Sequence, residues 1–158
     1  MSQPVPGRDN RRKLVLYVED QPANVLLMRA MFSRRPDYRL QIATDGASGL
    51  EAAQANQPDL LLLDINLPDC HGSELLRQLR MLPGCAHTPA IAVTADPLFS
   101  LSGTSFAELW HKPLRLQFAL GRLDRWLGQS QSAPQEPYAA MPSHANAFVG
   151  REESSLAR

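Results

Sequence analysis

Residues 58–68, PDLLLLDINLP, decide the fold of this chain. Four consecutive leucines predict a strand that is buried on both faces, as in the middle of a parallel sheet. Asp64 follows where that strand ends, and in open α/β sheets ligands bind outside the carboxyl ends of the strands. Asp64 is therefore either a reactive carboxylate or a cap for the next helix, and this stretch alone leaves both interpretations open.

Apolar runs and helical spacings alternate along the rest of the chain. The expected strands span residues 14–18, 38–43, 58–64, 89–93 and 108–111. The expected helices span residues 22–33, 47–56, 73–82 and 114–127. This alternation predicts an α/β fold, a doubly wound five-stranded parallel sheet with helices on both faces and with 38–43 nearer the edge.

The segment 98–107 lacks a helical pattern and is rich in Ser, Gly and Thr. A fourth helix, between the last two strands, is therefore expected to be shortened or absent. Phe99 and Phe106 lie in this segment. They either fill the core that the missing helix leaves open or remain exposed.

The composition excludes several classes of protein. The chain has 158 residues with 16 basic and 16 acidic side chains, so its net charge predicts no general attraction to nucleic acid or to a membrane surface. No apolar stretch approaches the roughly 20 residues that span a bilayer, and residues 1–10 lack the apolar core of a signal peptide. A cytoplasmic location is expected. Cys70 and Cys85 have no metal-ligand spacing and are expected to be free thiols.

We expect one folded domain, residues 13–128. Residues 1–12 are expected to be a disordered leader. Residues 129–158, rich in Ser, Gln, Pro, Ala and Glu, are expected to be a disordered tail.

Polar residues stand at the ends of four predicted strands, namely Glu19, Asp20, Asp64, Thr94 and Lys112. In a parallel sheet these ends share one edge, so the side chains can converge. Three carboxylates repel one another and need a cation, and all-oxygen ligation suits Mg²⁺. A neighbouring lysine leaves one carboxylate free as a nucleophile. The set predicts a site where an aspartate accepts a phosphoryl group, with Mg²⁺ and Lys112 neutralising the transferred oxygens.

Four motifs carry a family resemblance: VED at 18–20, LDINLP at 63–68 with Gly72 after it, VTA at 93–95, and KP at 112–113. Over residues 13–127 the chain resembles the response-regulator receiver domain, the CheY-like, flavodoxin-like phosphoacceptor module of two-component signalling. The stretch LYVEDQPAN at 16–24 also resembles receivers that are attached to hybrid sensor kinases or act with them.

The resemblance implies a role for each metal-site residue. Asp64 is implied to be the phosphoacceptor and Asp20 the direct Mg²⁺ ligand. Glu19 matches the acid that acts on the metal through water. Asn66 matches the position whose backbone carbonyl completes the metal site.

The resemblance also implies how the phosphoryl group is held. Thr94 matches the hydroxyl that moves to a phosphoryl oxygen, and Ala95 matches the small residue that leaves room for the group. Lys112 matches the phosphoryl-binding lysine, and its bond to Pro113 is expected to be cis.

Two departures from the family pattern have consequences. Leu109 stands where the family usually has an aromatic residue that swings inward on activation, so switching by that route is in doubt. Asn66 and Asp96 resemble the residues at the same positions in receivers that lose phosphate quickly, so a short-lived phosphorylated form is expected.

The functional hypothesis is a stand-alone receiver, because no recognisable output segment follows residue 127. Its donor would be a phosphohistidine on a histidine kinase or a histidine phosphotransfer protein, and it would signal through protein contacts or a phosphorelay. It would catalyse only its own phosphorylation and dephosphorylation. The alternative is a receiver-shaped binding scaffold that works without phosphorylation. An aspartyl-phosphate hydrolase of the haloacid dehalogenase type is disfavoured, because that family needs an acid where this chain has Asn66.

Overall fold

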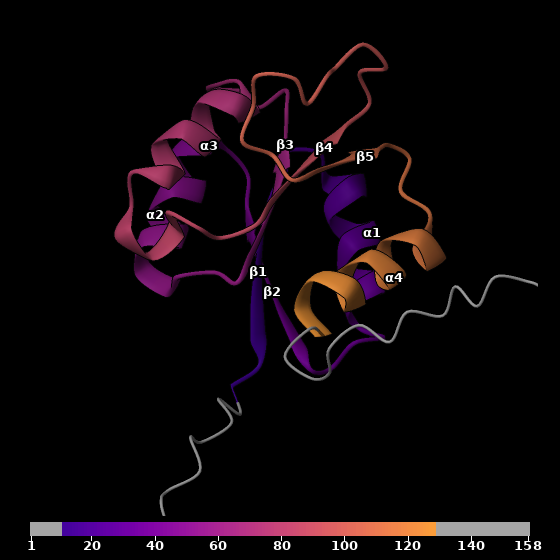
Figure 1. The fold of residues 1–158 in the computed structure, drawn as a ribbon. Helices are drawn as coiled ribbons and strands as arrows, with labels where there is room; N and C mark the ends of the chain where they lie inside the picture. The colour runs from indigo at the N-terminus through magenta and orange to yellow at the C-terminus, as the bar shows by residue number, and fades with distance from the viewer. Residues whose placement is uncertain (1–10, 129–158) are drawn as a thin grey trace, which may run out of the picture.

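Five parallel strands form the centre of the computed structural model, which describes residues 11–128 (Figure 1). The strands are β1 (Lys13–Val18), β2 (Tyr38–Ala43), β3 (Leu60–Asp64), β4 (Ala90–Thr94) and β5 (Glu108–His111). Their order is β2-β1-β3-β4-β5, so β2 is an edge strand and β3 lies in the middle. The predicted doubly wound, flavodoxin-like sheet is confirmed.

Helices cover both faces of the sheet. They are α1 (Pro22–Phe32), α2 (Gly46–Asn56), α3 (Gly72–Arg80) and α4 (Leu116–Leu127), with a short 3-10 turn, η1 (Pro83–Cys85), after α3. In Figure 1, α2 and α3 lie on one side of the sheet, and α1 and α4 lie on the other.

Two helix ends differ from the prediction by two residues, and three others differ by one. The third helix ends at Arg80 rather than at residue 82, and Leu82 is extended because the following proline disfavours helical backbone there. The last helix begins at Leu116 rather than at residue 114, because Arg115 is still extended.

The four leucines of β3 divide between two cores. Leu60 and Leu62 pack in the cluster under α1 and α4, whereas Leu61 and Leu63 pack in the cluster under α2 and α3. All four are fully buried. Successive side chains of a strand point to opposite faces, so an unbroken apolar run packs against the helices on both faces of the sheet. The expected central position of this strand is confirmed.

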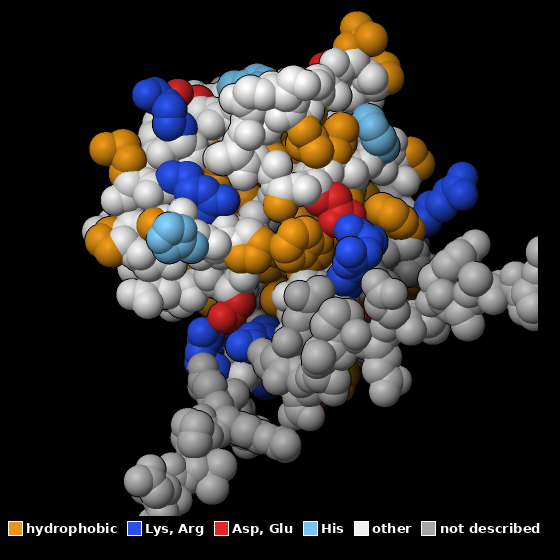
Figure 2. Space-filling view, in the orientation of Figure 1, with side chains coloured by type: hydrophobic (Ala, Val, Ile, Leu, Met, Phe, Trp, Pro, Cys, Tyr) orange, Lys and Arg blue, Asp and Glu red, His pale blue; other side chains and the backbone are white. Residues whose placement is uncertain are grey.

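No helix lies between β4 and β5 in the part of the chain that the structure describes. Phe106 is buried in the core on the α2 and α3 side, and half-buried Phe99 packs against that core with its ring 6.3 Å from the Phe106 ring. Phe106 therefore fills the core, as one of the two interpretations predicts, and Phe99 does so in part. Leu98, by contrast, is 88% exposed. Figure 2 shows hydrophobic side chains at the top of the molecule, where this loop lies in Figure 1.

The predicted leader up to residue 10 and the predicted tail 129–158 lie outside the described residues. Arg11, at the start of the described chain, forms an ion pair of 2.8 Å with Asp59. Cys70 and Cys85 are both free, as expected. No helix within residues 11–128 is long and apolar enough to cross a membrane.

Candidate functional site

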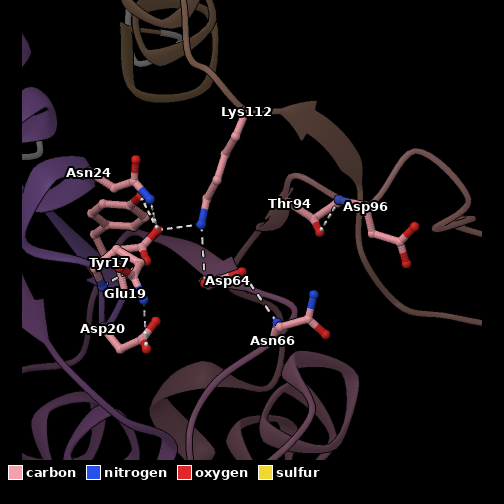
Figure 3. Close-up of polar contacts among 10 residues, drawn as sticks. Tyr17, Glu19, Asp20, Asn24, Asp64, Asn66, Thr94, Asp96 and Lys112 are labelled. Atoms are coloured by element: carbon pink, nitrogen blue, oxygen red, sulfur yellow. Dashed lines mark hydrogen bonds and ion pairs between the residues drawn. The ribbon is translucent and has the colours of Figure 1, made fainter.

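The carboxyl ends of β1, β3, β4 and β5 bring the predicted site residues together (Figure 3). Glu19 follows β1, Asp64 ends β3, Thr94 ends β4, and Lys112 follows β5. Glu19, Asp64 and Thr94 are all buried. Each of Glu19, Asp20 and Asp64 offers a carboxylate oxygen, and these atoms all lie within 4.8 Å of one another. The three oxygens form an all-oxygen donor set, which suits a hard divalent cation.

Lys112 reaches into this acidic cluster. Its Nζ lies 2.5 Å from Glu19 Oε2 and 3.1 Å from Asp64 Oδ2. The peptide bond between Lys112 and Pro113 is cis, as predicted. The cluster of three carboxylates thus contains one ammonium, which contacts two of them, and the site keeps an excess of negative charge.

The two buried acids respond differently to this environment. Burial raises the pKa of Asp64, and the nearby Lys112 does not fully offset it, so the net shift is upward. Burial also raises the pKa of Glu19, but hydrogen bonds from Lys112, the Gln21 backbone and Tyr17 outweigh it and hold that pKa below its usual range. Lys112 lowers the pKa of both acids, but Glu19 also accepts hydrogen bonds from Tyr17 and the Gln21 backbone, whereas Asp64 also faces the negative charge of Glu19.

Glu19 has neutral partners that the sequence did not point to. The Tyr17 hydroxyl donates to Oε2 over 2.9 Å, and the Asn24 amide donates to the same oxygen over 3.2 Å. The Gln21 backbone N–H donates to Oε1 over 3.0 Å. Tyr17 and Glu19 are two residues apart, so they lie on one side of the strand, and this spacing was the available signal.

Thr94 and Asn66 lie beside Asp64, on the same side of it in Figure 3. The Asp96 backbone N–H donates to Thr94 Oγ1 over 3.0 Å, and the Asn66 backbone N–H donates to Asp64 Oδ1 over 3.2 Å. Ala95 is exposed beside Thr94. The Asp96 carboxylate points away from Asp64 and accepts a hydrogen bond from the Leu98 N–H over 2.8 Å.

A glycine allows α3 to begin close to Asp64. A Cβ on Gly72 would collide with the backbone oxygen of Asp64. The Gly72 N–H donates to the Ile65 carbonyl over 2.7 Å, which closes the loop that carries Asn66. A side chain at position 72 would therefore displace this loop.

The model of the response regulator receiver domain family matches residues 15–98, which is more than half of the chain. The chain belongs to this family. Its sequence and site therefore place it among the receiver domains of two-component signalling. The match ends at the start of the segment where the usual helix is absent.

Several relatives are known proteins. The chain is 35% identical over 91 residues to the polar-differentiation response regulator DivK of Brucella anthropi, covering 58% of this chain and 71% of DivK. It is 30% identical over 115 residues to the histidine-protein kinase BarA of Escherichia coli, covering 70% of this chain. The chain spans only 12% of the length of BarA.

Among solved structures, the receiver domain of the sensor histidine kinase PA1611 from Pseudomonas aeruginosa is 28% identical, with a TM-score of 0.66. The match covers 73% of this chain and 98% of that one. That structure holds a magnesium ion coordinated in its active-site cleft. The corresponding feature of this chain is the cluster of Glu19, Asp20 and Asp64.

Proposed function

We propose that this receiver accepts a phosphoryl group on Asp64 from a phosphohistidine, in a Mg²⁺-dependent reaction. The observation that carries the proposal is the cluster of three carboxylates at the carboxyl edge of the sheet, two of which contact the single ammonium of Lys112. Such a site can bind a divalent cation, because the cation balances the net negative charge of three carboxylates and one ammonium, and the bound cation and Lys112 can then face the oxygens of an anionic group. The donor would be a histidine kinase or a histidine phosphotransfer protein.

In the proposed reaction an Oδ of Asp64 forms a bond to phosphorus while the phosphorus–nitrogen bond of the donor breaks. The leaving imidazole keeps the electron pair and takes up a proton. Bound Mg²⁺ would neutralise charge on the phosphoryl oxygens. Asp20 and Asp64 would ligate it directly with the Asn66 carbonyl, and Glu19 would act through water.

Lys112 and Thr94 would hold the product. The Lys112 ammonium, already 3.1 Å from Asp64, would bind one phosphoryl oxygen. The Thr94 hydroxyl would donate to another, and Ala95, small and exposed, would leave the group room. The Asp96 carboxylate points away from Asp64, so Asn66 is the better placed of the two residues behind the predicted short lifetime.

The output is proposed to be a protein contact or a further phosphotransfer. A second candidate, a scaffold that acts without phosphorylation, is favoured by the segment 98–107. This segment has no helix, and Leu109 replaces the usual aromatic residue on β5. Both features alter the part of a receiver that moves on activation.

Incubation with Mg²⁺ and acetyl phosphate, followed by intact mass, separates the two candidates. The proposal expects a phosphate adduct that requires Mg²⁺ and is absent from Asp64→Asn. Beryllofluoride, a phosphoryl mimic, should change tryptophan fluorescence in the wild type only. A folded wild type that forms no adduct would support the scaffold instead. Loss of the adduct within minutes would support the short lifetime, whereas persistence for hours would contradict it.

A further inference from the structure

Four donors converge on the buried carboxylate of Glu19, and three of them share one oxygen. Oε2 accepts from Tyr17, from Asn24 and from the Lys112 ammonium, whereas Oε1 accepts from the Gln21 N–H. The donors come from β1, from α1 and its start, and from the loop after β5. Glu19 is therefore one of the two carboxylates, with Asp64, that hold the Lys112 ammonium, and it links this ammonium to β1 and α1.

The Tyr17 hydroxyl donates its hydrogen bond to Glu19. The ring of Tyr17 is fully buried in the apolar cluster between the sheet and helices α1 and α4. Within residues 11–128 its hydroxyl has one hydrogen-bond partner, which is Glu19. Phenylalanine would fill the same space, so the hydroxyl contributes a hydrogen bond rather than packing.

The same oxygen of Glu19 attracts both the neutral donors and Lys112. Lys112 is closer to Glu19 than to Asp64, at 2.5 Å against 3.1 Å. The neutral donors fix the position of Oε2. Their hydrogen bonds also partly compensate its negative charge, which weakens its electrostatic attraction to the ammonium. The less tightly Glu19 holds the ammonium, the more readily it can move to an oxygen of an incoming phosphoryl group.

We infer that Tyr17 and Asn24 are positioning residues that, through Glu19, set where Lys112 lies and how readily it reaches the phosphoryl group on Asp64. The inference rests on the proposed function of Asp64. Neither residue touches the reacting atoms.

The test compares Tyr17→Phe with Tyr38→Phe in the full chain. Tyr38 is a matched control, because its hydroxyl donates to the carboxylate of Asp124 over 3.0 Å, away from the site. With acetyl phosphate and saturating Mg²⁺, Tyr17→Phe should lower the rate constant of adduct formation about 10-fold. The Mg²⁺ concentration for half-saturation should change less than 3-fold, and Tyr38→Phe should match the wild type in both.

Two further measurements exclude a general structural effect. In a Glu19→Gln background, Tyr17→Phe or Asn24→Ala should cause no further loss of rate, because both act through Glu19. In metal-free protein, the ¹⁵N resonance of the Lys112 ammonium, assigned by its absence in Lys112→Met, should shift in Tyr17→Phe and not in Tyr38→Phe.

The outcomes are distinct. Equal rates in wild type and Tyr17→Phe would overturn the inference alone, as would an equal loss in Tyr38→Phe or a loss that persists without the Glu19 carboxylate. Absence of any adduct from folded wild type would overturn the proposed function and the inference with it.

Discussion

Two glutamates of this protein, buried Glu19 and half-buried Glu108, accept hydrogen bonds from several donors each but differ in the charge around them. At the end of β1, the Glu19 carboxylate accepts hydrogen bonds from Tyr17 and Asn24 and forms an ion pair with Lys112. Glu108, at the start of β5, receives its own set of donors. These are the indole N–H groups of Trp110 and Trp126, over 2.9 and 2.8 Å, and the guanidinium of Arg122, over 2.5 Å.

Glu108 and Arg122 form a balanced pair, whereas Glu19 shares one lysine with Asp20 and Asp64. The balanced network links β5 to α4, and its charges are neutralised without a bound ion. The unbalanced network retains negative charge that the described residues do not neutralise. The comparison teaches that charge balance, rather than the number of hydrogen bonds, distinguishes a candidate cation site from a structural network.

Removing the lysine should have the largest effect on stability. Lys112→Met leaves buried Glu19 and Asp64 without a cation, so the free energy of unfolding without metal should fall by about 3 kcal/mol. Mg²⁺ should then raise the melting temperature of Lys112→Met more than that of the wild type. Equal shifts in thermal scans would show that Lys112 and the metal do not balance the same charge.

Glu108→Gln should cost about 2 kcal/mol of unfolding free energy, because Arg122 loses its partner while the two indoles retain an acceptor. Urea denaturation measures this cost. The change lies outside the acidic cluster, so the Mg²⁺-induced rise in melting temperature should match that of the wild type. A smaller rise would mean that the two networks are coupled.

Asp20→Asn should weaken Mg²⁺ binding at least 10-fold, about 1.4 kcal/mol, since it removes a proposed direct ligand. It also reduces repulsion between the carboxylates, so the metal-free protein should gain a fraction of a kcal/mol. Thermal scans with and without Mg²⁺ report both changes. Weaker Mg²⁺ binding together with a more stable metal-free protein would identify Asp20 as a ligand. A loss of both Mg²⁺ binding and stability would indicate a structural acid like Glu108.

The smallest expected effect is the pH dependence of the Glu108 network. Burial raises the pKa of Glu108, but hydrogen bonds from Arg122 and from the indoles of Trp110 and Trp126 outweigh this effect and hold the pKa below its usual range. Its stabilising contribution is therefore complete above the unfolded pKa of about 4.3 and is lost as the pH falls through the folded value. The difference in unfolding free energy between wild type and Glu108→Gln should shrink below that pH. A difference that grows on acidification would contradict the assignment.

The sequence was sufficient to predict the sheet, because the leucines of β3 can serve two cores only from a central strand. It also predicted the convergence of Glu19, Asp64 and Lys112, since parallel strands place their ends at one edge. It did not reveal the bond from Asn24 to Glu19 or the link from Glu108 to Arg122. Both depend on how a helix sits against the sheet, which periodicity alone does not determine.

The most direct measurement is a calorimetric titration of metal-free protein with Mg²⁺, comparing wild type with Asp20→Asn and Glu108→Gln. We expect one site in the wild type, the same affinity in Glu108→Gln and at least 10-fold weaker binding in Asp20→Asn. Equal binding in all three proteins, or no binding to the folded wild type, would contradict the claim that the unbalanced acidic cluster is a cation site.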